Sequence, residues 1–422
     1  MKGVMKEKVL VGVVDFKLRD SWPLQQTVYE MNELVKACNG EVVETIMCPA
    51  HPPNATTLIN SGKVQELADL VKAHQVDAVI LSAELKGHQQ RNLEETFGVK
   101  TLDRTNLILD IFARRASSQE GKLQVELAQL EYRLPRLAGH YDALSRLGGG
   151  IGTIGPGETK LEVDRRRIMQ RIDRLRQELL EVTKSRGVKR KKRVGQLVPL
   201  ISIVGYTNAG KSTLLNTLTD SAQETKDGLF TTLDSLARQC ALPNKQKVVF
   251  SDTVGFMHDL PHNLIEAFKA TLEEVQNADL LLHVLDISNP NYPNQKASVD
   301  AVLDELGVLK KPTIMVLNKI DRITDEEISL SARRKYGDAV AISALEKTNM
   351  GALLFKVEAA LAQLVEVIDV RLPLKRMDLV HLAHKEGEVM AENYDEDGVH
   401  IHARLPRHLA GMIRQAAISV GA

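Results

Sequence analysis

The sequence has few cysteines, and none of them lies near another. Cys38, Cys48 and Cys240 show neither the spacing of metal ligands nor that of a disulfide framework. We therefore expect free thiols in a reducing compartment, and we exclude a small secreted domain held by disulfides. The 422 residues are enough for two to four domains, each with its own core.

Net charge and long hydrophobic runs are also lacking. The 55 Lys and Arg residues equal the 55 Asp and Glu residues, so any affinity for nucleic acid must come from local basic patches. No apolar run approaches the roughly 18 to 20 residues that span a bilayer. The N-terminus is rich in lysine but soon carries further charges and a strand pattern, unlike a signal peptide. We expect a soluble, cytoplasmic protein with no membrane span.

Strand and helix patterns alternate along the first quarter of the chain. Apolar runs typical of buried strands are separated by amphipathic segments, and this alternation predicts a parallel sheet. The strands are expected at 8–16, 41–47, 77–81 and 99–102, and the helices at 24–37 and 62–73. The sequence thus predicts an N-terminal α/β domain over residues 1–102.

From residue 103 to 196 the pattern is helical. A long helix is expected over 159–185, and with the preceding helices it would form a helical arm. The apolar seam of this helix is Leu161, Ile168, Ile172, Leu175 and Leu179. Glycine is concentrated at 147–158, which is compatible with a flexible hinge or with a loop that closely approaches a large partner.

The second half of this arm is strongly basic. Residues 164–193 carry thirteen Lys or Arg and four Asp or Glu, a local charge of +9. A solvated face is the ordinary interpretation of such a run. In an otherwise neutral chain, contact with a nucleic-acid phosphate backbone is the better hypothesis. Few aromatic residues interleave the charges, which disfavours base stacking on single strands.

A glycine-containing segment follows an expected strand that ends at Val204, and it precedes an expected helix. Strand, glycine loop and helix in this order are the context of a phosphate-binding P-loop. Its backbone N–H groups would surround an anion at the positive end of the helix dipole. Lys211 would reach the β- and γ-phosphates, and Ser212 would ligate Mg²⁺. The residues expected to contact nucleotide here are Gly205, Tyr206, Thr207, Asn208, Ala209, Gly210, Lys211, Ser212 and Thr213.

Two further segments would complete a nucleotide switch. One is Asp252-Thr253-Val254-Gly255, which follows an expected strand at 246–251. The Asp252 carboxylate would hold Mg²⁺ through water, and the Gly255 amide would sense the γ-phosphate. The other segment includes Phe230, Thr231 and Thr232, and Thr232 is favoured over Thr231 as the ligand of Mg²⁺ and the γ-phosphate. Such a segment orders around the triphosphate and relaxes after hydrolysis.

A base-reading segment, Asn318-Lys319-Ile320-Asp321, follows an expected strand at 313–317. The Asp321 carboxylate would accept from the ring N–H and the exocyclic amine of guanine, whereas adenine would leave it unpaired. Lys319 would lie along the base, and Asn318 would tie the P-loop to this strand. Ser343 and Ala344 would close over the base with their backbone. The four segments predict a Ras-like P-loop GTPase domain over 197–366.

Phe256 follows Gly255, where many switch GTPases carry a glutamine that orients the attacking water. A phenyl side chain neither donates nor accepts a hydrogen bond, so intrinsic hydrolysis should be slow and depend on an activator. The alternative is that a nearby side chain such as His258 orients the water. Asn208 adds K⁺ as a hypothetical cofactor, since P-loops of this form occur in GTPases that recruit K⁺ through the asparagine.

Residues 367–422 are expected to form a small α+β domain with a docking or regulatory role. Strands at 388–394 and 399–404 flank an Asp-Gly turn, which is a hairpin signal, and helices are expected at 375–384 and 407–417. Four histidines of this domain could suggest a metal site, but they lack cysteine or acidic residues at matching spacing, and ordinary surface histidines are favoured. They are His381, His384, His400 and His402.

Further motifs link the nucleotide-binding segments to the rest of the chain. They include Leu102-Asp103-Arg104 and its continuation to Ala113, and the segments 120–127, 149–152, 155–162, 164–166, 260–262 and 267–268. With the P-loop and Asp252-Thr253-Val254-Gly255-Phe256, this set resembles the HflX family of ribosome-associated GTPases along nearly the whole chain.

The resemblance implies a monomeric GTP hydrolase that uses Mg²⁺, with Lys211, Thr232 and Gly255 at the reacting phosphate. It also implies binding to the large ribosomal subunit and its rRNA, splitting of stalled or idle ribosomes, and contact rather than hinge function for the glycine-rich loop. The alternative is a ribosome-assembly or RNA-binding scaffold gated by GTP. Ile154 and Ser235 depart from the family pattern, where arginine and proline are common.

Overall fold

The computed structural model describes residues 6–17, 22–137, 160–194, 198–219, 229–230, 236–261, 264, 269–324, 326–395 and 398–417. The chain divides into two compact units. One comprises Met1–Leu180, Lys226–Asp234 and Asp259–Lys269, and the other comprises Glu181–Thr225, Ser235–His258 and Ala270–Ala422. Within the described parts, no helix is both long enough and apolar enough to cross a membrane.

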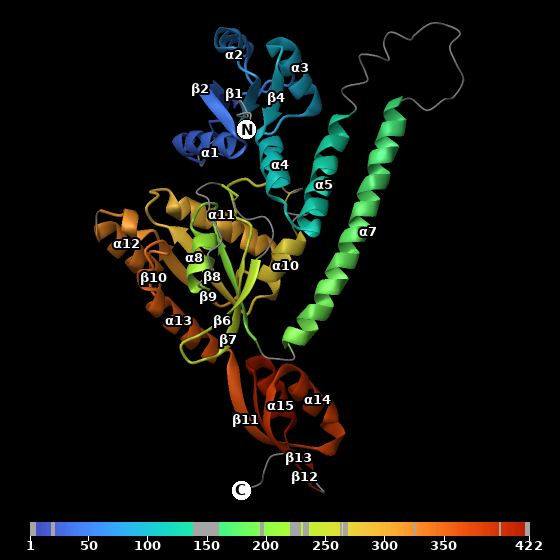
Figure 1. Ribbon diagram of the computed structural model, residues 1–422, viewed down its shortest axis with the longest axis vertical. Coiled ribbons are helices and arrows are strands. Elements are labelled where there is room, and N and C mark those ends of the chain that lie inside the picture. The colour runs from blue at the N-terminus through green and yellow to red at the C-terminus, as the bar shows by residue number, and fades with distance from the viewer. Residues whose placement is uncertain are drawn as a thin grey trace, which may run out of the picture. The chain divides into compact units, whose positions relative to one another are not determined.

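The N-terminal sheet has four parallel strands in the order β2-β1-β3-β4. The strands are β1 (Glu7–Asp15), β2 (Gly40–Pro49), β3 (Ala78–Leu81) and β4 (Lys100–Asp103), and they alternate with helices α1 (Leu24–Ala37), α2 (Ser61–His74) and α3 (Gly87–Phe97) (Figure 1). The predicted parallel α/β fold is confirmed. Helix α3 was not predicted, because Leu93 and Phe97 are its only buried apolar residues and give a weak periodicity.

Helices α4 (Arg104–Arg115) and α5 (Gln119–Arg133) follow, then the short turn η1 (Leu134–Arg136) and the long helix α7 (Lys160–Val194). Helices α5 and α7 run side by side in Figure 1, joined by a seam of Leu123, Leu127, Ile172 and Leu175. The Arg171 guanidinium also donates two hydrogen bonds, of 2.7 and 2.8 Å, to the Glu126 carboxylate.

Helix α7 extends nine residues beyond its predicted end, because its Lys and Arg residues favour helix even where the apolar seam has ended. The glycine-rich segment 147–158 lies outside the described residues.

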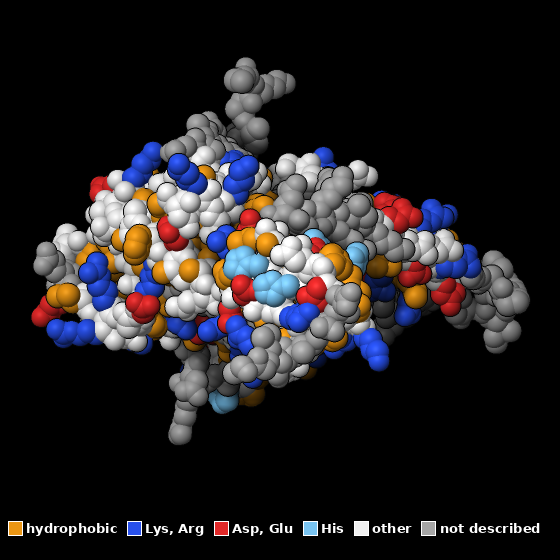
Figure 2. All heavy atoms as spheres, turned by 90° about the horizontal axis from the view of Figure 1, so that it is seen from below, with side chains coloured by type: hydrophobic (Ala, Val, Ile, Leu, Met, Phe, Trp, Pro, Cys, Tyr) orange, Lys and Arg blue, Asp and Glu red, His pale blue; other side chains and the backbone are white. Residues whose placement is uncertain are grey.

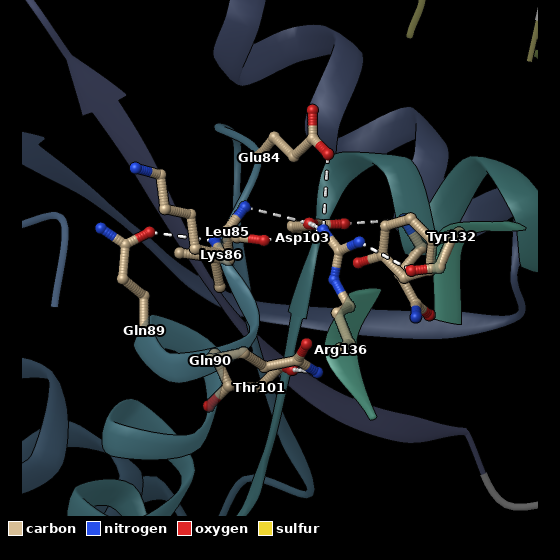
Figure 3. Close-up of polar contacts among 10 residues, drawn as sticks. Glu84, Leu85, Lys86, Gln89, Gln90, Thr101, Asp103, Tyr132 and Arg136 are labelled. Atoms are coloured by element: carbon tan, nitrogen blue, oxygen red, sulfur yellow. Dashed lines mark hydrogen bonds and ion pairs between the residues drawn. The ribbon is translucent and has the colours of Figure 1, made fainter. Parts of the chain in front are cut away.

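A polar cluster joins η1 to the end of the N-terminal sheet (Figure 3). Asp103, which is 1% exposed, accepts hydrogen bonds from the amides of Asn106 at 2.8 Å and Leu85 at 3.0 Å, and contacts the Arg136 guanidinium at 3.3 Å. The Arg136 guanidinium lies 3.5 Å from the centre of the Tyr132 ring. One buried carboxylate thus caps α4 and fixes both η1 and the loop after β3.

Replacing Asp103 by alanine is expected to lower the free energy of unfolding by about 3 kcal/mol, because it leaves a buried guanidinium and two backbone amides without their acceptor. Urea denaturation measures the change. Asp110→Ala is the matched control, since Asp110 is an exposed carboxylate on α4, the helix that Asp103 caps, and it pairs with Arg114 at 3.4 Å. This control should change stability by less than about 0.5 kcal/mol. Equal effects of the two substitutions would contradict the structural role of Asp103.

The second sheet has six strands in the order β10-β9-β8-β5-β7-β6. Its strands are β5 (Leu200–Gly205), β6 (Leu236–Ala241), β7 (Lys247–Asp252), β8 (Leu280–Asp286), β9 (Thr313–Asn318) and β10 (Val340–Ala341). Strand β6 is antiparallel to β7 and the other pairs are parallel. The surrounding helices are α8 (Lys211–Leu218), α10 (Lys269–Asn277), α11 (Tyr292–Glu305), η3 (Ile320–Arg322), α12 (Glu326–Tyr336) and α13 (Met350–Ala362). This order brings the carboxyl ends of β5, β7, β8 and β9 to one edge, which is where ligands bind in such sheets.

The C-terminal sheet is antiparallel, with the order β11-β13-β12. It contains β11 (Val365–Leu372), β12 (Glu388–Asp395) and β13 (Gly398–Pro406), with η4 (Leu374–Arg376), α14 (Met377–Glu386) and α15 (Arg407–Ala416). The predicted α+β character is confirmed. Strand β11 was not predicted, and it crosses the boundary predicted at residues 366 and 367. Its alternation is weak, since residues on both of its faces are partly exposed.

Candidate functional site

The P-loop connects β5 to α8, in the predicted order of strand, loop and helix. Gly210, immediately before α8, has a φ of 94°. A Cβ at this position would lie 2.3 Å from Nδ2 of Asn318, so a side chain is excluded by both the backbone conformation and the close approach of β9. The Lys211 ammonium group donates to the carbonyls of Gly205 at 3.1 Å and Tyr206 at 2.8 Å. The loop therefore wraps around the lysine that was predicted to reach the phosphates.

Burial gives Lys211 unusual electrostatics. The side chain is only 6% exposed, and burial lowers its pKa from 10.5 to about 8, with the Asp252 carboxylate acting in the opposite direction and Lys319 in the same direction. A buried ammonium group with few negative neighbours is costly. An anion bound in the loop would supply the missing negative charge, so the electrostatics favour phosphate at this place.

Ser212 and Asp252 meet where a Mg²⁺ ion was predicted. Asp252 ends β7, and residue 203 of β5 lies opposite it in the parallel register. The Ser212 hydroxyl, in the first turn of α8, donates to the Asp252 carboxylate at 2.6 Å. A hydroxyl and a carboxylate are the hard oxygen donors that Mg²⁺ prefers, so the residues fit this ion.

The base-reading residues are held by hydrogen bonds to the P-loop. The Asn318 side chain donates to the Ala209 carbonyl at 2.8 Å and accepts from the Ala344 amide at 3.0 Å. Lys319 donates to the Asn208 carbonyl at 2.7 Å and pairs with Asp286, also at 2.7 Å. The Asn318 side chain thus connects the end of β9 to the loops that follow β5 and β10. The sequence predicted the first of these connections, between Asn318 and the P-loop.

Asp321 and Ser343 lie in the same region with different environments. Oδ1 of Asp321, in η3, is buried and has no hydrogen-bond partner among the residues that the structure describes. Ser343 is fully buried, and its hydroxyl accepts from the Glu346 amide at 3.1 Å, which holds the turn that leads to Ala344. A buried carboxylate oxygen without a partner is costly, and a ligand with two N–H donors would satisfy it.

The segment after β7 pairs with the P-loop through its backbone. Phe256 donates its amide to the Gly205 carbonyl at 3.2 Å, and its carbonyl accepts from the Thr207 amide at 2.7 Å. The Tyr206 hydroxyl accepts from the His258 amide at 2.9 Å. Thr253, between Asp252 and Val254, is fully buried and donates to the carbonyl of residue 203 at 2.8 Å. Sequence reasoning missed the Tyr206–His258 contact, since no local pattern reports it.

The other predicted switch segment is described only in part. Phe230 belongs to the compact unit that contains the N-terminal sheet, where its ring meets that of Phe112 edge-on with centroids 4.7 Å apart. Thr231 and Thr232 lie outside the described residues, as does Ser235. Thr213, next to Ser212 on α8, is partly exposed.

His283, on the central strand β8, is a buried polar residue that sequence reasoning missed. It is 1% exposed, its Nδ1 lies 3.7 Å from an Asp300 oxygen on α11, and its Nε2 has no hydrogen-bond partner among the described residues. Burial lowers the pKa of His283 from 6.5 to about 3, helped by the charges of Lys296 and Lys211. Its place within an apolar run made it resemble a core position in the sequence.

Replacing His283 by glutamine is expected to reduce the acid sensitivity of folding. Between pH 6.5 and about 3 the unfolded chain binds a proton at His283 that the folded chain does not, so the free energy of unfolding decreases by up to about 1.4 kcal/mol for each unit by which the pH is lowered. The variant should lose this contribution. Urea denaturation at pH 7, 6 and 5 measures it, with His381→Gln, on an exposed residue of α14, as the control. Identical pH slopes in both variants would contradict the prediction.

Three of the four C-terminal histidines lie beside acidic residues, and Figure 2 shows histidine side chains gathered with acidic ones on one face. His400 and His402 contact the two oxygens of Asp369 at 2.7 and 3.5 Å, and His384 contacts Glu392. Among the described residues, no group of three or more His, Cys, Asp or Glu side chains is placed to hold a metal ion. The three cysteines are free thiols.

Comparison with known proteins links the chain to one family. Residues 25–113 match a family model described as GTP-binding GTPase N-terminal, 115–193 match one described as GTP-binding GTPase Middle Region, and 200–319 match one described as 50S ribosome-binding GTPase. A GTPase HflX of Caldanaerobacter subterraneus is 46% identical over 94% of this chain and 91% of its own length. A GTPase HflX of Alkalihalophilus pseudofirmus is 43% identical over 90% of this chain and 88% of its own length. One of Escherichia coli is 38% identical over 95% of this chain and 94% of its own length. The chain belongs to the HflX family of GTPases.

Proposed function

We propose that this GTPase binds GTP with Mg²⁺ at the P-loop edge of the six-stranded sheet. The Lys211 ammonium group contacts the β- and γ-phosphates, the Gly255 amide contacts the γ-phosphate, and Asp321 reads the guanine base. Ser212 ligates Mg²⁺ directly, Asp252 acts through water, and Thr232 completes the metal site from the other switch segment. When bound, Mg²⁺ neutralises charge that develops on the phosphate oxygens.

The partner that we propose is the large ribosomal subunit. The observation that carries this proposal is the match of residues 200–319 to a model described as 50S ribosome-binding GTPase. The GTP-bound protein would split stalled or idle ribosomes, and the ribosome would accelerate hydrolysis, which would then release the protein. We propose that a monomer performs this cycle.

The basic helix α7 supports rRNA as the surface contacted. Arg165, Arg166, Arg167 and Arg174 are exposed, whereas Ile172 and Leu175 face the seam with α5, and Arg176 pairs with Glu131 of α5 at 2.8 Å. Exposed guanidinium groups along one helix suit contacts with successive phosphates, and such contacts weaken as salt rises.

The test is GTP turnover with and without purified large subunits, together with sedimentation of joined ribosomes in the presence of a non-hydrolysable GTP analogue. Stimulated turnover and ribosomes separated into subunits are the expected results. Stimulation with intact ribosomes would contradict splitting and favour the assembly-scaffold alternative. Absence of both binding and stimulation would contradict the proposed partner.

Potassium is a further proposed cofactor. Asn208 has a φ of 61°, and its carbonyl is held by Lys319 at 2.7 Å, so the backbone that carries its side chain is fixed within the loop expected to enclose the phosphates. A K⁺ ion held there would supply positive charge to the reacting phosphate. Turnover is expected to be at least about 10-fold faster in KCl than in NaCl at matched ionic strength. Equal turnover in the two salts would contradict this role of Asn208.

A further inference from the structure

Phe256 cannot hydrogen-bond the water that attacks the γ-phosphate, and the structure contains a hydroxyl group that can. Phe256 is 3% exposed, and its hydrogen bonds to Gly205 and Thr207 are made by its backbone. Its side chain has no polar atom with which to orient a water molecule. The group that orients the attacking water must therefore come from another residue near the γ-phosphate position.

Thr207, the third residue of the P-loop, carries a buried hydroxyl that has no hydrogen-bond partner within the described part of the chain. Thr207 is 6% exposed, and its Oγ1 makes no hydrogen bond with any residue that the structure describes. Two neighbouring hydroxyls differ, since Thr253 donates to a main-chain carbonyl at 2.8 Å and Ser212 donates to Asp252 at 2.6 Å. An unsatisfied buried hydroxyl costs about 1–3 kcal/mol, a cost that is relieved if a bound molecule supplies its partner.

The position of Thr207 is fixed against the residues proposed to bind the γ-phosphate. A Cβ added to Gly255 would lie 2.8 Å from Cγ2 of Thr207, 3.0 Å from its Cα and 3.1 Å from the Lys211 ammonium nitrogen. The Thr207 methyl group and Cα and the Lys211 ammonium group therefore lie around the Gly255 backbone, and the Thr207 hydroxyl is bonded to the same Cβ as this methyl group. The hydrogen bond from the Thr207 amide to the Phe256 carbonyl, of 2.7 Å, holds this arrangement.

His258, the other candidate, is held in a different way. Its amide donates to the Tyr206 hydroxyl at 2.9 Å, and its ring Nδ1 lies 3.5 Å from the Ser298 hydroxyl on α11. The imidazole thus already contacts a helix that lies outside the P-loop. Thr207 is the better candidate, because it belongs to the loop that would enclose the phosphates, whereas His258 does not.

We propose that Oγ1 of Thr207 orients the attacking water during GTP hydrolysis, in place of the glutamine that this chain lacks. The hydroxyl accepts a hydrogen bond from the water and donates its own hydrogen to a γ-phosphate oxygen, a combination that one hydroxyl can provide. The water oxygen bonds to the γ-phosphorus as the bond from that phosphorus to the β–γ bridging oxygen breaks. The bond electrons leave with GDP, and the water proton passes to the released phosphate, so Thr207 is unchanged.

The test compares Thr207→Val, which keeps the β-branched shape but removes the hydroxyl, with Thr207→Ser, which keeps the hydroxyl. Single-turnover hydrolysis by the protein without ribosomes is expected to fall about 10²-fold in the valine variant and to stay within about threefold of the parent in the serine variant. Thr313→Val is the matched control, because Thr313 is an exposed residue at the start of β9 whose hydroxyl bonds to the Lys311 carbonyl at 2.9 Å.

A binding measurement separates a catalytic role from a structural one. The valine variant is expected to bind a non-hydrolysable GTP analogue as the parent does, but to lose affinity for GDP with aluminium fluoride, which mimics the phosphoryl group in transfer. Parent-like hydrolysis by Thr207→Val would overturn the proposal. Equal loss of affinity for both ligands would also overturn it, since that loss would mean a role in folding or ground-state binding.

His258→Gln provides the remaining comparison. If this substitution slows hydrolysis and Thr207→Val does not, His258 orients the water and the proposal is wrong. The proposal rests on the proposed GTP site but not on the ribosome. A parent protein that hydrolyses GTP without stimulation by large subunits would contradict the proposed partner and leave the Thr207 result interpretable.

Discussion

Replacing Asp321 by asparagine is expected to lower the affinity for GTP by about 10³-fold and to raise the affinity for xanthosine triphosphate. Oδ1 of Asp321 is buried and lacks a partner among the described residues, so the guanine ring N–H and exocyclic amine would satisfy this carboxylate. Two hydrogen bonds to a charged acceptor contribute about 1.5–3 kcal/mol each, and about 4 kcal/mol corresponds to a factor of about 10³.

The structure of xanthine explains why Asp321→Asn should favour xanthosine triphosphate over GTP. It has a carbonyl where guanine has the exocyclic amine, so an asparagine amide can donate to that carbonyl while its oxygen accepts from the ring N–H. Equilibrium binding of fluorescent analogues of both triphosphates measures the change. Asp304→Asn, on an exposed carboxylate of α11, is the control and should leave both affinities unchanged. An unaltered preference for GTP in Asp321→Asn would show that another residue reads the base.

The parts of the site that could be predicted are those in which one short segment carries both the chemistry and the backbone geometry. The P-loop is such a segment, because its glycines, Lys211 and Ser212 follow one strand and begin one helix. Asp252 and Asn318 each end a strand of the same sheet, so the parallel order of the strands brings them to one edge. Their contacts with Ser212 and Ala209 follow from this topology.

The parts that could not be predicted depend on contacts between distant segments or on weak local signals. His283 is polar, but it lies in a run of apolar residues on β8, and only the burial of that strand on both faces makes the histidine unusual. The Tyr206–His258 hydrogen bond joins residues separated by 52 positions. Strand β11 pairs with β13 over eight residue pairs, but its sequence alternates too weakly to indicate a strand. Each of these features is fixed by tertiary packing.

Replacing Lys211 by methionine is expected to stabilise the nucleotide-free protein while abolishing GTP binding and hydrolysis. Burial lowers the pKa of Lys211 from 10.5 to about 8, so the charged side chain costs the folded protein on the order of 3 kcal/mol at neutral pH. Methionine fills a similar volume without a charge. The same substitution removes the ammonium group that would contact the β- and γ-phosphates, and loss of a charge-assisted contact to a phosphate should cost at least about 10²-fold in affinity.

The pH dependence identifies the cause of the added stability. Below pH 8 both the folded and the unfolded parent hold the Lys211 proton, so the full cost is present. Between about pH 8 and 10.5 only the unfolded chain holds the proton, and the stability of the parent rises with pH. The advantage of Lys211→Met should therefore be largest at pH 7 and shrink as pH rises to 10. Lys247→Met, on an exposed residue of β7, should show no such trend.

Saturating nucleotide should make the parent protein more stable than Lys211→Met, which is the reverse of their order without nucleotide. A ligand that binds only the folded state adds about 4 kcal/mol of stability at a thousand times its dissociation constant, and this gain is available to the parent but not to Lys211→Met. Thermal unfolding with and without GDP and GTP measures both effects in one experiment. A variant that is less stable than the parent without nucleotide would show that the Lys211 ammonium group holds the empty loop together through its bonds to Gly205 and Tyr206. The loop would then depend on its lysine for folding as well as for binding phosphate.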